Sequence, residues 1–165
     1  MPVVVLAAEA VGATGAETPE ELEAKAAVKA KVEAIRLEAG RRMTLGDVTR
    51  KTVPKMSLVS PPRHGGALST RTFIPHRVHE AIGVLGAVSV ATAAALPGSV
   101  AADIARLGPG RQLVEVEHPT GFFTVDLEVG GSFPDVTVRK SALLRTARRL
   151  MKGEVYVPAS VWAGS

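Results

Sequence analysis

The pattern of apolar and polar residues divides the chain into an early helical part and a strand-rich remainder. An unbroken apolar run at residues 3–8 predicts a buried strand. Thr18, Pro19 and Glu21 are typical of a capped helix start, and apolar residues then recur at helical spacing up to Gly40, where we expect the helix to end. The opposite face of this helix is charged and is expected to face solvent; its residues are Glu23, Lys25, Lys29, Lys31, Glu33 and Arg36.

After residue 53 the pattern is typical of strands. Residues 68–74 alternate between polar and apolar side chains, with Ser69, Arg71 and Phe73 among them, and this alternation predicts a strand. A turn-rich loop, PPRHGG at residues 61–66, precedes this strand. The expected strands are residues 55–60, 68–74, 112–117, 122–129 and 136–146, with a final strand at 154–158.

An uncharged segment between Glu80 and Asp103 predicts a second helix, over residues 77–96. Its side chains are apolar on every face, and a helix of this kind must be surrounded by other elements. The strands are the only material available to surround it, and its glycine and alanine residues would allow them to approach closely. We therefore expect an α+β fold in which a curved, barrel-like antiparallel sheet wraps around a central apolar helix, in a single domain over residues 1–165.

Several classes of protein are excluded by composition and segment length. The chain has 165 residues and no cysteine, which excludes a disulfide scaffold, a thiolate zinc site and a catalytic thiol within it. Pro97 interrupts the uncharged run before it reaches the ~20 residues that a membrane span needs. The apolar N-terminus lacks the basic residues that begin a signal peptide. We therefore expect a cytoplasmic protein without a membrane segment.

Two histidines and an arginine lie at the start of the predicted second helix. They are His76, Arg77 and His79, and a helix N-terminus favours anions such as carboxylate or phosphate. The alternative is that His76 caps the helix and Arg77 is merely exposed. His79 and Glu80 do not continue into the HExxH motif of zinc proteases, because residue 83 is glycine. We therefore expect no metal site here.

A second candidate group lies between two predicted strands, where the sequence reads His118, Pro119, Thr120 and Gly121. These residues are typical of a tight turn and need have no further role. As part of a site they would offer an imidazole, a hydroxyl and a free backbone N–H. Such donors suit a bound carboxylate or a developing enolate.

The stretch from residue 136 to 153 contains six basic residues and no acidic one. A net charge of +4 suits a small anion as well as nucleic acid, but this stretch could also form an electrostatic footprint for a polyanion. It lacks interleaved aromatic residues for base stacking, which argues against a nucleic-acid partner. Non-catalytic binding of a polyanion or of nucleic acid by residues 136–153 is kept as the alternative function. Its basic residues are Arg139, Lys140, Arg145, Arg148, Arg149 and Lys152.

Five groups of residues together resemble one known family. They are residues 33–40 with Met43 and 45–48, residues 53–56 with 58–59 and 61–63, residues 73–77 with His79 and 82–84, residues 117–121, and residues 144–151. In this combination the chain resembles the C-terminal half of the 4-oxalomesaconate tautomerases, within the methylaconitate isomerase (PrpF-like) family. The resemblance extends over nearly the whole chain, and the run TARRLM at residues 146–151 is a specific marker of it.

This resemblance implies a fold akin to diaminopimelate epimerase, in which two similar halves each wrap a curved sheet around a helix. It also implies a cofactor-independent proton shift in an unsaturated tricarboxylate, by an acid/base group and donors to the developing oxyanion. The family's proton-transferring lysine and cysteine lie in the N-terminal half, and Val78 stands where relatives often carry a cysteine. The chain is therefore expected to be an incomplete enzyme, completed by an N-terminal half or a second copy, to which residues 154–158 would return.

The sequence thus predicts a site for a small anionic tri- or dicarboxylate, with no metal and no cofactor. His79 and His76 are the candidates for acid/base catalysis. The substrate-binding candidates are His76, Arg77, His79, His118, Thr120 and Gly121, to which Arg63 and Arg145 are added as carboxylate-binding residues.

Overall fold

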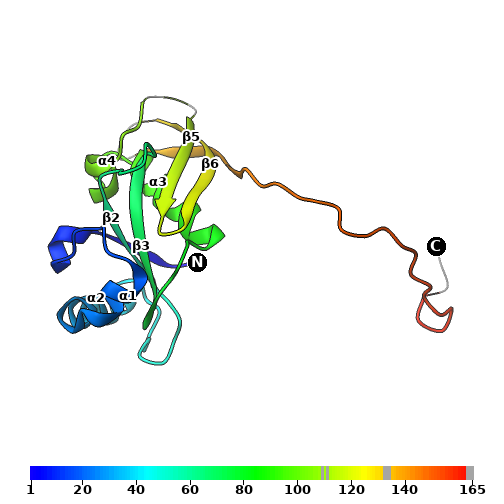
Figure 1. Ribbon diagram of the computed structural model, residues 1–165, viewed down its shortest axis with the longest axis horizontal. Coiled ribbons are helices and arrows are strands. Elements are labelled where there is room, and N and C mark those ends of the chain that lie inside the picture. The colour runs from blue at the N-terminus through cyan, green and yellow to red at the C-terminus, as the bar shows by residue number, and fades with distance from the viewer. Residues whose placement is uncertain (109, 111, 132–134, 163–165) are drawn as a thin grey trace.

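A computed structural model describes residues 1–108, 110, 112–131 and 135–162 (Figure 1). It contains a mixed sheet with helices on both of its faces. In chain order the elements are β1 (Val3–Ala7), the 3₁₀ helix η1 (Ala8–Val11), α1 (Pro19–Ala24), α2 (Ala26–Arg42), β2 (Lys55–Ser60), β3 (Leu68–Ile74), β4 (Arg77–Val78), α3 (Val84–Ala95), α4 (Val100–Ile104), β5 (Gln112–His118), β6 (Gly121–Gly130) and β7 (Thr137–Leu143).

The strands form one curled sheet in the order β1-β2-β3-β5-β6-β7, with the short β4 paired to β3. The expected curved sheet around a central helix is confirmed, but the sheet is mixed and not wholly antiparallel. β1 pairs with β2, and β3 with β5, in parallel. Each of these two pairs is joined through helices, α1 and α2 in one case and α3 and α4 in the other. A helical crossover returns the chain in its original direction, which makes the paired strands parallel.

Alternate residues of the strands divide the core between the two faces of the sheet. On β2, Leu58 packs toward α1 and α2, together with Leu22 and Phe73. Its neighbour Val59 packs on the other face, in the cluster that contains Val90 of α3. Figure 1 shows α1 and α2 on one side of β2 and β3, and α3 on the other. Burial of both faces explains why β2 is almost continuously buried.

Helix α3 begins at Val84, so the predicted helix over residues 77–96 is wrong in its first part. Arg77 and Val78 instead fold back onto β3 as β4, and the His79 N–H donates to the Thr72 carbonyl oxygen at 2.8 Å. These backbone groups are used by the sheet and cannot also form a helical turn. None of the helices among the described residues combines the length and the apolar character that crossing a membrane would require.

The capped start of the first helix is confirmed, whereas its predicted end is not. Thr18 Oγ1 accepts from the Glu21 N–H at 3.2 Å, and the Glu21 carboxylate accepts from the Thr18 N–H at 2.9 Å. The helix divides at Lys25 and then continues past Gly40 to Arg42. Gly40 does not end the helix but lets it pack closely, because a Cβ there would lie 2.5 Å from a methyl carbon of Val48.

Beyond β7 the chain runs away from the sheet as an extended segment, residues 144–162 (Figure 1). We call it the C-terminal arm. The strand predicted at residues 154–158 is not formed, because no described residue offers it a partner backbone. Four apolar or aromatic side chains of the arm are 86–89% exposed: Leu150, Met151, Val155 and Tyr156. The expectation that this part of the chain pairs with a further half stays a prediction.

Candidate active site

The turn between β5 and β6 is the first component of the candidate site. The two strands stay paired down to His118 and Gly121, and Gly121 has a φ of +145°, which side chains rarely allow. The Thr120 N–H donates to His118 Nδ1 at 3.3 Å, and Thr120 Oγ1 donates to the Glu80 carbonyl oxygen at 3.1 Å. The turn is therefore tied to the segment that precedes α3. His118, Thr120 and Gly121 lie together, as the sequence predicts.

His118 is half-buried in this turn, and its surroundings favour the neutral imidazole. Burial lowers the pKa of His118 and outweighs a hydrogen bond with the Phe122 backbone, which raises it. The charges of His79 and Arg71 make smaller contributions that also lower this pKa. A neutral imidazole at physiological pH can accept a proton. His118 therefore has the ionisation state that a general base requires, with His79 as its neighbour.

A cavity of about 670 Å³ opens beside the turn. It is lined by residues of the segment before α1, the start of α1, the loop at residues 61–66, β3, the segment before α3 and the turn after β5. The lining residues with charged or polar side chains are Glu17, Thr18, Glu20, Arg63, His64, Arg71, Glu80 and Thr120. Of the predicted substrate-binding residues, Arg63 and Thr120 are brought together here.

Arg71 is the most deeply buried cation of this cavity, at 8% exposure. Its Nε donates to the Glu17 carbonyl oxygen at 2.5 Å, and its Nη1 donates to the Thr70 carbonyl oxygen at 2.7 Å. Burial lowers the pKa of Arg71, and the charge of Arg63 acts in the same direction. A guanidinium nevertheless stays protonated in proteins. The cavity therefore contains a fixed positive charge with N–H groups to spare, as carboxylate binding requires.

Glu17 anchors the acidic side of the same cavity. Its Oε1 accepts from Lys25 Nζ at 2.7 Å and from the Thr14 N–H at 2.8 Å. Burial by itself would raise the pKa of Glu17, but these hydrogen bonds lower it to about 2. Glu17 is therefore ionised, with Oε1 paired to Lys25 and with the buried Oε2 lacking a hydrogen-bond partner among the described residues. The other two carboxylates of the cavity, Glu20 and Glu80, are exposed.

The low pKa of Glu17 predicts a loss of stability in acid. Because the pKa falls from 4.5 in the unfolded chain to about 2 in the folded one, the stabilisation is complete above pH 4.5 and is lost as the pH falls toward 2. We expect the urea midpoint of Glu17→Gln to fall less over this range than that of the unmutated chain. The control is Glu9→Gln at an exposed position, and equal slopes for all three proteins would contradict the prediction.

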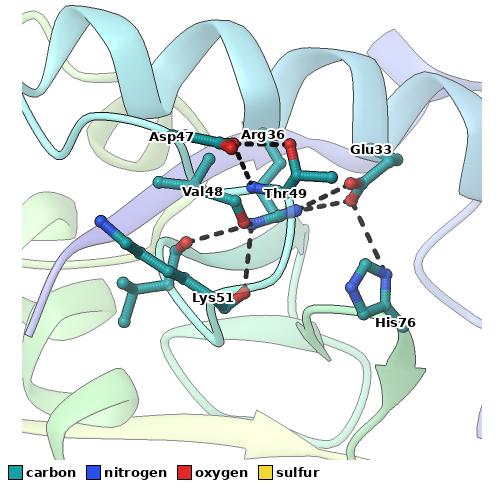
Figure 2. A network of polar contacts seen from close by, with 8 residues as sticks. Glu33, Arg36, Asp47, Val48, Thr49, Lys51 and His76 are labelled. Carbon is teal, nitrogen blue, oxygen red and sulfur yellow. Dashed lines mark hydrogen bonds and ion pairs between the residues drawn. The ribbon is translucent and has the colours of Figure 1, made fainter.

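The structure separates His76 and Arg77 from this cavity. His76 Nδ1 lies 3.9 Å from an oxygen of Glu33, which is itself paired with Arg36, and Figure 2 shows His76 pointing toward this network. Arg77 is exposed, and its charge acts on Glu23 of α1. A helix would have gathered both residues at its first turn, whereas the observed turn and β4 direct them toward α1 and α2. The helix-start argument for these two residues is therefore wrong.

The true start of α3 borders a smaller cavity of about 290 Å³. Its lining includes His79, Thr72 and Lys55, together with the first residues of α3. Gly83 provides no side-chain cap, so the first N–H groups of the helix remain available to an anion. Burial lowers the pKa of Lys55. Of the three residues predicted at a helix start, His79 alone is placed near one.

Arg145 also lies apart from the cavity that Arg63 lines. Its guanidinium carbon is 4.3 Å from the centre of the Phe123 ring, where it makes a cation–π contact. The remaining basic residues of the C-terminal arm, Arg148, Arg149 and Lys152, are exposed. The proposed grouping of Arg145 with the other carboxylate-binding residues is therefore not observed.

Sequence reasoning missed several residues that the fold brings to the two cavities, above all Arg71, His64 and Lys55. Arg71 occupied a polar position in the alternating pattern of residues 68–74, which is typical of a solvent-facing side chain. One feature of the sequence could have indicated a role for Arg71 in the site. Arg71 lies in a strand that is otherwise rich in serine and threonine and that follows the PPRHGG loop. Within the described residues, no three histidine, aspartate or glutamate side chains are grouped as metal ligands would be.

Comparison with known proteins places this chain in a family. The model of the family described as PrpF protein matches residues 1–158. A (4E)-oxalomesaconate Delta-isomerase from Novosphingobium sp. (strain KA1) is 56% identical over 95% of this chain and 43% of that protein. A 4-oxalomesaconate tautomerase from Pseudomonas putida is 52% identical over 99% of this chain and 45% of that protein.

The fold agrees with this relationship. The crystal structure of a methylitaconate-delta-isomerase matches 99% of this chain with a TM-score of 0.81 and 26% identity, and the match covers 46% of that chain. The chain thus spans less than half the length of each of these proteins. Both the family resemblance carried by the sequence motifs and the expected half-barrel fold are confirmed. Matched by its family model over nearly its full length, the chain belongs to the PrpF family.

Proposed function

We propose that this chain provides the carboxylate-binding part of an isomerase active site, for a small unsaturated tricarboxylate of the 4-oxalomesaconate type. The observation that carries the proposal is the buried guanidinium of Arg71 in a cavity that also contains Arg63 and His64. The names of the two relatives that are 56% and 52% identical support this substrate class.

The arginines of the cavity bind and orient the substrate carboxylates. Arg71 is held by two backbone carbonyls, so little side-chain entropy is lost when it binds an anion. Arg63 and His64 lie at the open, exposed side. Thr120 lines the cavity at the turn after β5. A substrate with several carboxylates would contact more than one of these groups at once.

The reaction supported by this arrangement is a proton shift. A base removes a proton from a carbon beside the carbonyl group, negative charge collects on the oxygen, and an acid returns a proton at the other end of the conjugated system. His118 and His79 are the acid/base candidates within this chain. We place the principal proton-transferring groups in the remaining part of the enzyme, as the family resemblance implies, and expect no cofactor to take part.

The remaining part is expected to dock against the C-terminal arm. The arm exposes more apolar side-chain surface than a segment of a folded protein usually does. The residues concerned are Leu150, Met151, Val155 and Tyr156. Leu85, in the first turn of α3, is also 56% exposed. An N-terminal half of the family fold, or a second copy of this chain, would cover these residues and close the site.

Titration calorimetry with trans-aconitate, a stable unsaturated tricarboxylate, tests the proposal on the 165-residue chain. We expect binding of trans-aconitate, weak binding of acetate, and no tautomerisation of 4-oxalomesaconate above background in an ultraviolet assay. Addition of the N-terminal half of the Pseudomonas putida relative should then restore the reaction. Absence of tricarboxylate binding would contradict the proposal. Binding of DNA with a steep salt dependence would favour the alternative, polyanion binding by residues 136–153.

A further inference from the structure

We infer that Glu117 is the positioning residue that holds the arginine-bearing loop, residues 61–66, in its anion-binding geometry. This inference rests on the proposed function. Glu117 is the last residue but one of β5, and it is 2% exposed. Its carboxylate accepts hydrogen bonds from the backbone N–H groups of Arg63 (2.9 Å), His64 (2.7 Å) and Gly66 (2.9 Å). The side chain thus binds the loop by its main chain.

The loop is built to fit against this carboxylate. A Cβ at Gly66 would lie 2.7 Å from Cγ of Glu117 and 2.8 Å from the Glu115 carbonyl oxygen, so only glycine allows the approach. The same carbonyl oxygen accepts from the Ala67 N–H at 2.8 Å. The loop is therefore joined to β5 by one backbone bond and by the Glu117 carboxylate, with no room between them.

Three N–H donors also explain how a carboxylate can be buried at this point. An unpaired buried charge is very costly, whereas one that accepts several hydrogen bonds is stabilised in its ionised form. Burial would raise the pKa of Glu117, but the N–H groups of Arg63, His64 and Gly66 outweigh it and lower the pKa. The Glu117 carboxylate is therefore ionised, and its negative charge lies on the side of the loop away from the cavity that Arg63 and Arg71 line.

Glu117 also connects this loop to the other components of the site. Its carbonyl oxygen accepts from Thr70 Oγ1 at 2.8 Å, one residue before Arg71 on β3. The next residue along the chain is His118, where the turn with Thr120 begins. One side chain and its own backbone thus set the relative positions of Arg63, Arg71 and His118. A loop that merely covered the sheet would not need its main chain fixed in this way.

Glu117→Gln tests the inference, because an amide has one acceptor oxygen and directs an NH₂ group at N–H donors. We expect hydrogen exchange at the Arg63, His64 and Gly66 amides to accelerate at least about tenfold, with unchanged exchange in β2. The dissociation constant for trans-aconitate should rise roughly ten- to a hundredfold. The matched control is Glu115→Gln, the same substitution two residues earlier on β5 at an exposed position, which should change neither quantity.

The possible outcomes separate this inference from the proposed function. Unchanged loop exchange in Glu117→Gln would overturn the role of Glu117 alone. Faster exchange with unchanged binding would overturn its link to anion binding. Failure of the unmutated chain to bind trans-aconitate would overturn the proposed function and, with it, the binding role of the loop.

A measurement on the unmutated chain applies even if the variant does not fold. The Arg63, His64 and Gly66 amide resonances should shift together on acidification, with one midpoint below the ordinary glutamate value of 4.5. Separate midpoints, or no shift, would contradict the inference.

Discussion

Replacement of Arg71 by lysine is expected to raise the dissociation constant for trans-aconitate about ten- to a hundredfold. The guanidinium of Arg71 spans the Glu17 and Thr70 carbonyl oxygens and still has N–H groups for a ligand. A lysine keeps the charge, but its single ammonium cannot satisfy two carbonyl oxygens and also bind a carboxylate in a planar, bidentate manner. Titration calorimetry at fixed ionic strength measures the change directly.

Arg77→Lys is the matched control for this prediction. Arg77 is exposed on the short strand β4 beside β3, and it does not line the cavity of Arg71. We expect its substitution to leave the dissociation constant nearly unchanged. An equal loss of trans-aconitate affinity in Arg71→Lys and Arg77→Lys would indicate that Arg77 also binds the ligand, as the sequence pattern predicts. It would contradict a site built around Arg71.

Replacement of Arg36 by methionine is expected to lower the free energy of unfolding by about 3–5 kcal/mol. The Arg36 side chain is 0% exposed and donates to both carboxylate oxygens of Glu33 at 2.7 Å. Its Nη1 also donates to the carbonyl oxygens of Val48 (2.9 Å) and Val53 (3.0 Å), in the network of Figure 2. Methionine has a similar length but no donors, so the carboxylate and these carbonyls would lose their partner within the fold.

Urea unfolding of Arg36→Met and Arg41→Met makes the comparison within one helix. Arg41 also pairs with a glutamate three residues earlier, at 2.6 Å, but its side chain is 72% exposed. We expect Arg41→Met to change the stability very little, because water replaces the lost partner. A similar loss for both variants would show that the buried network around Arg36 stabilises the fold no more than a surface pair does.

Arg36 and Arg71 show where prediction from the sequence stops. Arg36 belongs to a charged helix face that the sequence pattern predicts to be solvated, and Arg71 has a polar position in an alternating strand. Both are buried in the structure. The loop at residues 48–53 covers Arg36, and the segment before α1 covers Arg71. Each covering segment is separated from its arginine by more than ten residues in sequence. The local pattern of polar and apolar residues therefore cannot reveal the burial of either arginine.

The same limit explains the divided site. The residues of the turn after β5, His118, Thr120 and Gly121, were predicted together and lie together because a tight turn is a local structure. His76 and Arg77 were grouped with His79 on the assumption of a helix. Pairing of β4 with β3 replaced that helix, since hydrogen bonds to an existing strand satisfy the backbone as well as a helical turn does.

The features that depend on near neighbours along the chain could be predicted from the residues alone: the Thr18 cap, the strands near residues 55–60 and 68–74, the turn after β5 and the motifs of the PrpF family. Long-range packing, in contrast, sets which strands are parallel, which arginines are buried, where α3 begins and which side chains share a cavity. These features depend on contacts between segments that are distant in sequence, such as Glu17 and Arg71, which are 54 positions apart. Their free energies depend on the tertiary contacts and burial of each residue, and not on its neighbours along the chain.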